Sequence, residues 1–329
     1  MRTIFALVVI LILFVLGGCN KDNNVKFGIM MPSMDVEYYI NAVKGFESKI
    51  NELGGEVLVA DAKNDENLQI KQASELIEKG VSVIVIDAVN VNTAARIVRM
   101  AQDKRVKIIA YDRMILNSRP DFYVSFNSVK IGEYMADYAI KRKPTGNYIL
   151  LFGDSGDLNA HAVREGMLNI LDSKIKSGDI NIMYRAYIEN WSGKNAYHKV
   201  KQILDFSFET PDVILSSYDG MSTASRRAFD DSNIHKPIII TGQNGEAEAL
   251  TNILKGKQSM TIYKPAEQLG QITADIAWKF EKDKNSIPED LLVSNNKFDI
   301  PALLLNPIVI DSLNIHAELI DKGLFDANN

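Results

Sequence analysis

Hydrophobic and polar positions follow two alternating patterns along this chain. Short apolar runs typical of buried strands are separated by segments whose apolar residues recur every third or fourth position. Lys26–Met31 is the first such run, and Tyr39, Val43 and Phe46 then share one face of a predicted helix. The same order continues through Glu56–Ala60, Leu68–Ile77, Val81–Ile86, Ala94–Gln102 and Val106–Tyr111. This strand–helix repetition, with strands rich in Val and Ile, predicts a parallel, doubly wound sheet.

A second series of the same plan begins near Asn147. Its predicted strands are Tyr148–Phe152, Ile180–Tyr187, Val213–Ser216, Ile238–Thr241 and Met260–Tyr263. Its predicted helices are Ala162–Lys174, Ala196–Leu204, Ser222–Phe229 and Ala247–Leu254. A helix over Ala266–Lys282, a strand over Ala302–Leu305 and a helix over Leu313–Lys322 follow. This tail is too short for a third domain, so we expect it to cross back between two α/β lobes.

The N-terminal segment has the pattern of an export signal. Arg2 precedes the apolar run Thr3–Leu16, which is shorter than the roughly 20 residues that a comfortable bilayer span needs. Leu16-Gly17-Gly18-Cys19 resembles the lipobox of bacterial lipoproteins, in which the Cys is diacylated and becomes the new N-terminus. We expect residues 1–19 to be a lipoprotein signal peptide and residues 20–25 a polar tether. An uncleaved membrane anchor is the alternative, and both place the folded body outside the cytoplasmic membrane.

Composition and charge narrow the classes of function. A chain of 329 residues is long enough for two lobes, and its net charge of −5 without a basic stripe argues against nucleic acid as a partner. Cys19 is the only Cys, so neither an internal disulfide nor a thiolate zinc site is available. The four His residues lack metal-ligand spacing. Phosphate-loop and nucleophile-elbow motifs are also absent, and we expect no metal and no cofactor.

Polar and aromatic side chains follow several predicted strands. Ligands of open α/β sheets bind outside the carboxyl ends of the strands, and Asp112-Arg113 directly follows one of these ends. Other strand ends offer Asn159, Trp191, Asp219, Asn244 and Lys264. Charged groups and amides exchange hydrogen bonds with sugar hydroxyls, and an indole covers the C–H face of the ring. Taken singly, the Asp112-Arg113 pair could be a structural salt bridge, Trp191 a hydrophobic anchor and Lys264 a solvated side chain. Together they suit a small sugar.

Four segments resemble the D-xylose-binding periplasmic proteins that serve ABC importers. They are IIAYDRMI (108–115), DFYVSFNSVKIGEYMA (121–136), SMTIYKP (259–265) and IPALLLNPIVID (300–311). The resemblance runs from about Val25 to the C-terminus, and it implies two Rossmann-like, doubly wound lobes joined by three crossovers. This is the type I periplasmic binding fold, which closes around a sugar. On this basis residues 26–126 plus 264–290 are expected to form the first lobe, and 127–263 plus 291–329 the second.

The resemblance also implies a set of ligand-binding residues. Positions that match the family are Asp112, Arg113, Asn159, Trp191 and Lys264. Asp219 keeps the acid of a family Asn-Asp pair whose Asn is Tyr218 here, and Asn244 stands where the family has an Asp after Gly-Gln. In the first loop, Asp35 and Tyr38 take the place of the family's Arg residues. The expected ligand-binding set therefore also includes Asp219, Tyr218, Asn244 and Tyr38, in a site re-tuned relative to the family.

The resulting hypothesis is a lipid-anchored, extracytoplasmic binding protein rather than an enzyme. Its ligand would be D-xylose or a similar aldose, and its partner a membrane ABC permease. A membrane histidine kinase in two-component sugar sensing is the alternative partner. A third reading is a sugar hydrolase, which needs two carboxylates across the scissile bond, with Asp112 and Asp219 as the candidates. The neighbouring Arg113 makes Asp112 a poor proton donor.

Overall fold

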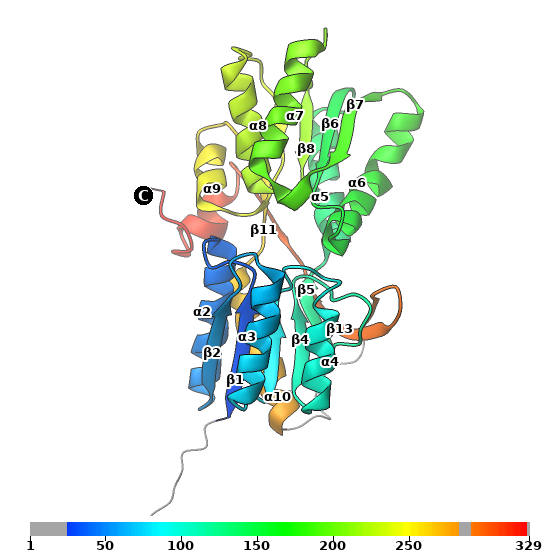
Figure 1. The fold of residues 1–329 in the computed structure, drawn as a ribbon. Helices are drawn as coiled ribbons and strands as arrows, with labels where there is room; N and C mark the ends of the chain where they lie inside the picture. The colour runs from blue at the N-terminus through cyan, green and yellow to red at the C-terminus, as the bar shows by residue number, and fades with distance from the viewer. Residues whose placement is uncertain (1–24, 283–290, 328–329) are drawn as a thin grey trace, which may run out of the picture.

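The computed structural model describes residues 25–282 and 291–327, which form two α/β lobes (Figure 1). A cavity lies between these lobes. The expected signal peptide, the lipobox residue Cys19 and tether residues 20–24 lie outside the described residues. Within the described part of the chain, no helix combines the length and the apolar content required to cross a bilayer.

The first lobe is built on a seven-stranded sheet in the order β12-β13-β5-β4-β3-β1-β2. Its strands are β1 (Lys26–Met31), β2 (Glu56–Asp61), β3 (Val83–Ile86), β4 (Lys107–Tyr111), β5 (Phe122–Phe126), β12 (Leu292–Ser294) and β13 (Asp299–Leu305). All neighbours pair in parallel except β12, which runs antiparallel to β13. The helices of this lobe are α2 (Glu37–Glu52), α3 (Glu66–Glu78), α4 (Ala95–Asp103) and α10 (Ala266–Lys282).

The second lobe has a parallel four-stranded sheet in the order β7-β6-β8-β9. Its strands are β6 (Gly146–Phe152), β7 (Ile180–Tyr187), β8 (Val213–Ser216) and β9 (Ile239–Ile240). A three-stranded sheet beside it contains β10 (Gln243–Asn244), β11 (Met260–Tyr263) and β14 (Ile308–Asp311). The helical segments are α5 (Ser128–Arg142), α6 (Leu158–Lys176), η1 (Glu189–Trp191), α7 (Gly193–Phe206), α8 (Asp219–Asp231), α9 (Ala247–Leu254) and η3 (His316–Ile320).

Side chains on both faces of the first sheet are buried, as its hydrophobic strands predict. In β1, Phe27 and Ile29 belong to the core that includes α2 and α10, whereas Met30 faces the core that includes α3 and α4. The α2 and α10 helices approach closely because small residues lie between them. A Cβ atom added at Gly45 would lie 2.0 Å from the carbonyl oxygen of Glu267, so only glycine permits this packing.

The chain passes between the lobes three times. The first passage follows β5, the second joins β11 to α10, and the third joins β13 to β14. Three segments far apart in sequence therefore lie together at the hinge, where Figure 1 shows β11 running between the lobes. The predicted fold class, two doubly wound lobes joined by three crossovers, is confirmed.

Several details differ from the sequence-based expectations. Residues 291–329 were expected in the second lobe, but β13 pairs in parallel with β5 and so extends the sheet of the first lobe. The chain returns to the second lobe only at β14, which pairs with β11. The predicted final helix Leu313–Lys322 is reduced to η3. In addition, β5 was not predicted as a separate strand, although all five of its residues are buried.

Candidate ligand-binding site

A cavity of about 380 Å³ lies between the lobes, at the carboxyl ends of strands from both sheets. It is lined by Val36, Tyr38, Tyr39, Asn64, Asp112, Arg113, Ser128, Asp157, Asn159, Asn190, Trp191, Gly193, Tyr218, Gln243, Asn244 and Lys264. Of the residues expected from the sequence, this wall brings together Tyr38, Asp112, Arg113, Asn159, Trp191, Tyr218, Asn244 and Lys264. These eight side chains, which come from both lobes, therefore line one common cavity.

Asp112 and Lys264 form a buried ion pair at the base of the cavity. The Lys264 Nζ atom lies 3.2 Å from Oδ1 of Asp112 and 4.5 Å from the centre of the Tyr38 ring. Ser125 Oγ also donates to Oδ1 of Asp112, at 3.2 Å. Asp112 has a φ of 53°, which is unusual for a residue with a side chain and is typical of functional sites. The Tyr38 ring also stabilises the Lys264 ammonium through a cation–π contact.

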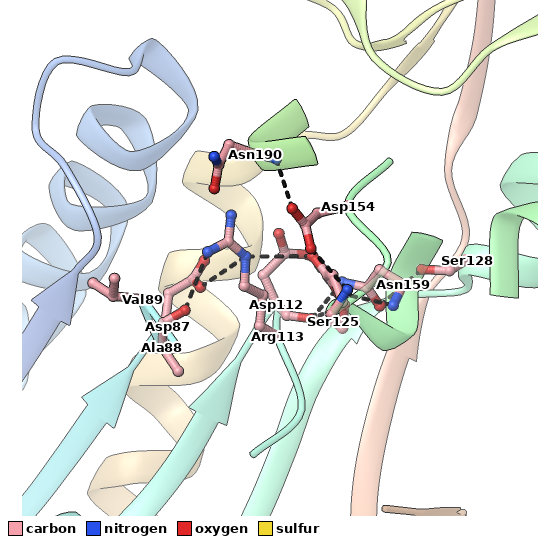
Figure 2. Close-up of polar contacts among 12 residues, drawn as sticks. Asp87, Ala88, Val89, Asp112, Arg113, Ser125, Ser128, Asp154, Asn159 and Asn190 are labelled. Atoms are coloured by element: carbon pink, nitrogen blue, oxygen red, sulfur yellow. Dashed lines mark hydrogen bonds and ion pairs between the residues drawn. The ribbon is translucent and has the colours of Figure 1, made fainter. Parts of the chain in front are cut away.

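Arg113 is held by groups from both lobes (Figure 2). Within the first lobe, its Nη1 donates to the carbonyl oxygen of Ala88 at 3.1 Å, and its Nε lies 3.6 Å from Oδ1 of Asp87. From the second lobe, Oδ2 of Asp157 lies 3.4 Å from the same Nε. Burial raises the pKa of both Asp87 and Asp157, and the nearby Arg113 charge opposes this rise.

Asn159 also connects the lobes. Asp157 caps the first turn of α6, because its Oδ1 accepts a hydrogen bond from the backbone N–H of Asn159 at 2.9 Å. This bond fixes the backbone position from which the Asn159 side chain extends. The Nδ2 of Asn159 donates to the carbonyl oxygen of Asp112 at 2.8 Å, and its Oδ1 accepts from Ser128 Oγ at 3.1 Å. The carboxylate of Asp157 and the carboxamide of Asn159 thus both contact the first lobe.

Trp191 forms an aromatic wall of the cavity. Its ring packs against Gly153 so closely that a Cβ atom added there would lie 2.2 Å from the indole. Asn190 and Trp191 both have positive φ angles, 54° and 53°, and the backbone N–H of Asn190 is held by Asp154 Oδ2 at 2.6 Å. This turn places the half-buried indole where it lines the cavity and also packs against the core of the second lobe.

Asp219 differs from the expectation, because it is not among the described residues that line the cavity. It is 1% exposed, and its carboxylate accepts hydrogen bonds from Gln258 Nε2, Thr261 Oγ1 and the backbone N–H of Gly245, each at 2.8 Å. Burial raises its pKa to about 7. Asp219 thereby holds the loop that carries Asn244, and the ligand-binding role assigned to it is corrected to a structural one.

Sequence reasoning missed several groups of the site. Asp157 stands two residues before Asn159 as a helix cap, and Asp87 directly follows the predicted strand Val81–Ile86, so the strand-end rule could have found Asp87. Ser128 follows β5, the strand that was not predicted. Within the described ranges, no cluster of three or more His, Cys, Asp or Glu side chains could hold a metal ion.

Comparison with known proteins assigns the chain to a family. The model of the periplasmic binding protein domain matches residues 27–285. The chain belongs to the periplasmic binding protein family. Among the relatives of this periplasmic binding protein is the D-xylose-binding periplasmic protein of Haemophilus influenzae, which is 31% identical over 94% of this chain and 93% of that protein.

Two further similarities extend over most of this periplasmic binding protein. The D-xylose-binding periplasmic protein of Escherichia coli is 30% identical, covering 91% of this chain and 90% of its own length. The solved structure of a carbohydrate transporter solute-binding protein from Chloroflexus aurantiacus, in complex with D-glucose, is 25% identical. It aligns with a TM-score of 0.84 over 93% of this chain and 98% of that chain.

Proposed function

We propose that this protein binds a monosaccharide outside the cytoplasmic membrane, with D-xylose or a similar aldose as the ligand, and that it is not an enzyme. The observation that carries the proposal is the interlobe cavity, which combines ionic groups, carboxamides and one indole face. The D-xylose-binding relatives, which align with more than nine tenths of this chain, support the choice of sugar.

The chemistry of the wall matches a sugar. Asp112 and Asp157 accept hydrogen bonds from hydroxyl groups, while Arg113, Lys264 and Asn159 donate to them. Hydrogen bonds to charged groups contribute roughly 1.5–3 kcal/mol each, and the Trp191 face covers the apolar side of the ring. The hydrolase reading lacks this support, because its second carboxylate, that of Asp219, is turned into the lobe and bonded there.

Binding is coupled to closure of the two lobes. A sugar in the cavity contacts both lobes, so it favours the closed form by the difference in its affinity for the two forms. The contacts of Arg113 with Asp157 and of Asn159 with Asp112 already cross the cleft and would tighten in that form. The closed protein is then the form that a membrane ABC permease recognises.

The proposed lipid anchor suits this arrangement. In Figure 1, β1 begins at the end of the first lobe that lies away from the cleft. A diacylated Cys19 would therefore leave the cleft open to ligand. Metabolic labelling with a radioactive fatty acid should mark the wild-type protein and leave the Cys19→Ala variant unlabelled. Equal labelling of both proteins would contradict lipidation at this residue.

Calorimetric titration with a panel of pentoses and hexoses tests the central proposal. We expect saturable heat with at least one aldose and its loss in the Trp191→Ala variant. The absence of both heat and a thermal shift with every sugar would overturn the proposal. Co-purification from membranes in the presence of that sugar distinguishes an importer permease from a sensor kinase.

A further inference from the structure

Asp87 is a buried carboxylate to which none of the described residues donates a hydrogen bond. It directly follows β3, it is 0% exposed, and within the described part of the chain no group donates a hydrogen bond to either of its oxygens. Asp87 forms an ion pair with Arg113, whose Nε lies 3.6 Å from its Oδ1. Because burying a carboxylate without donors is unfavourable, this side chain lowers the stability of the first lobe.

The backbone around Asp87 is nevertheless held firmly. Gln69 of α3, which is 2% exposed, donates from Nε2 to the carbonyl oxygen of Asp87 at 2.8 Å and accepts from the backbone N–H of Val89 at 3.0 Å. These two hydrogen bonds, which we call the Gln69 clamp, fix the backbone from Asp87 to Val89. They thereby fix the positions of the Asp87 carboxylate and the Ala88 carbonyl oxygen. Both groups point at the guanidinium of Arg113, one at Nε and the other at Nη1 (Figure 2).

We propose that Asp87 is a positioning residue of the sugar site, whose buried carboxylate fixes the orientation in which Arg113 meets the ligand. The inference rests on the proposed function, in which Arg113 is a ligand-binding residue. Asp87, Ala88 and Gln69 all belong to the first lobe, so they hold Arg113 even when the second lobe moves away. The contact with Asp157, by contrast, exists only while the lobes are close. Asp87 thus prepares the open form for its ligand.

The Asp87→Asn variant tests this role, because it keeps the shape of the side chain and removes its charge. We expect its affinity for the sugar that the wild type binds to fall at least tenfold, while its melting temperature stays unchanged or rises. The matched control is Asp219→Asn, which changes a buried carboxylate that has several donors. That variant should have a lower melting temperature, because Gln258, Thr261 and Gly245 donate to both carboxylate oxygens of Asp219 and the carboxamide offers only one oxygen as an acceptor.

A double-mutant cycle shows whether Asp87 acts through Arg113. In an Arg113→Lys background, which keeps the charge and loses the planar fork, Asp87→Asn should reduce affinity less than twofold further. An undiminished tenfold loss in that background would overturn the inference, as would unchanged affinity in the single variant. A fall in melting temperature that accompanies the loss of affinity would show a merely structural role. A wild type that binds no sugar would instead refute the proposed function.

Discussion

Lys264 and Asp112 are joined by an ion pair, 3.2 Å between Nζ and Oδ1, although they are separated by 152 positions in the sequence. Lys264 lies on the second crossover, between β11 and α10, whereas Asp112 directly follows β4 of the first lobe. The pair therefore ties the hinge to the floor of the cavity. A shift of the segment that follows β11 would therefore change the ion pair of a carboxylate that lines the cavity.

Removal of the lysine charge should affect both stability and binding. The Lys264→Met variant leaves the carboxylate of Asp112 buried without its cation, which typically costs about 3–5 kcal/mol. We expect a loss of this size in urea unfolding, together with the loss of sugar binding. Lys44→Met is the control, since the Lys44–Glu267 pair is exposed, and its effect should stay within about 0.5 kcal/mol. Equal effects of the two changes would contradict the assigned role.

A methyl group at position 153 should displace the aromatic wall. In the Gly153→Ala variant the new Cβ would overlap the Trp191 indole, so the ring has to leave its present position. We expect a tenfold or greater loss of sugar affinity and a shifted fluorescence maximum, measured in a Trp278→Phe background that removes the other tryptophan. If fluorescence and affinity both match those of the background protein, Trp191 is not held by this contact.

The carboxamide of Asn159 should favour approach of the lobes. The Asn159→Ala variant loses the hydrogen bond to the carbonyl oxygen of Asp112, and we expect about tenfold weaker sugar binding and a larger radius of gyration without ligand. Small-angle scattering and calorimetry measure the two effects. Asn181→Ala removes a similar bond, to Asn147 within the second lobe, and should change neither quantity. A radius unchanged in Asn159→Ala would argue against an interlobe role.

Asp219 should make stability depend on pH. Burial raises its pKa to about 7 in the folded protein, above its ordinary value of 3.8, so the folded state binds more protons between these values. Unfolding then releases a proton, and stability should fall as pH rises from about 4 to 7 and level off above. At 1.36 kcal/mol for each pH unit, the free energy of unfolding should fall by at most about 4 kcal/mol over this range. Urea unfolding from pH 5 to 8 should show a steeper fall in the wild type than in Asp219→Asn; identical slopes would contradict the shift.

Part of the candidate site was predicted from the positions at which strands end. Asp112 and Trp191 were placed at the cavity because the carboxyl ends of parallel strands gather at one edge of each sheet. The same rule misplaced Asp219, because a strand end does not determine which way the following side chain turns. Asp219 turns inward, toward the donors Gln258 and Thr261, and those contacts are not local in the sequence. Asp157 was also missed, because its role as a helix cap depends on the residue at which α6 begins.

The sequence by itself determined the alternation of strands and helices and the two-lobed plan, because periodicity is a local property of the chain, and it named half of the residues that line the cavity. Only the tertiary structure decided that β13 joins the first sheet, since pairing with β5 brings together segments about 180 residues apart. The tertiary structure also decided that Asp87 lies against Arg113. That contact depends on the neighbouring positions of β3 and β4 and on the clamp by Gln69, none of which a single segment encodes.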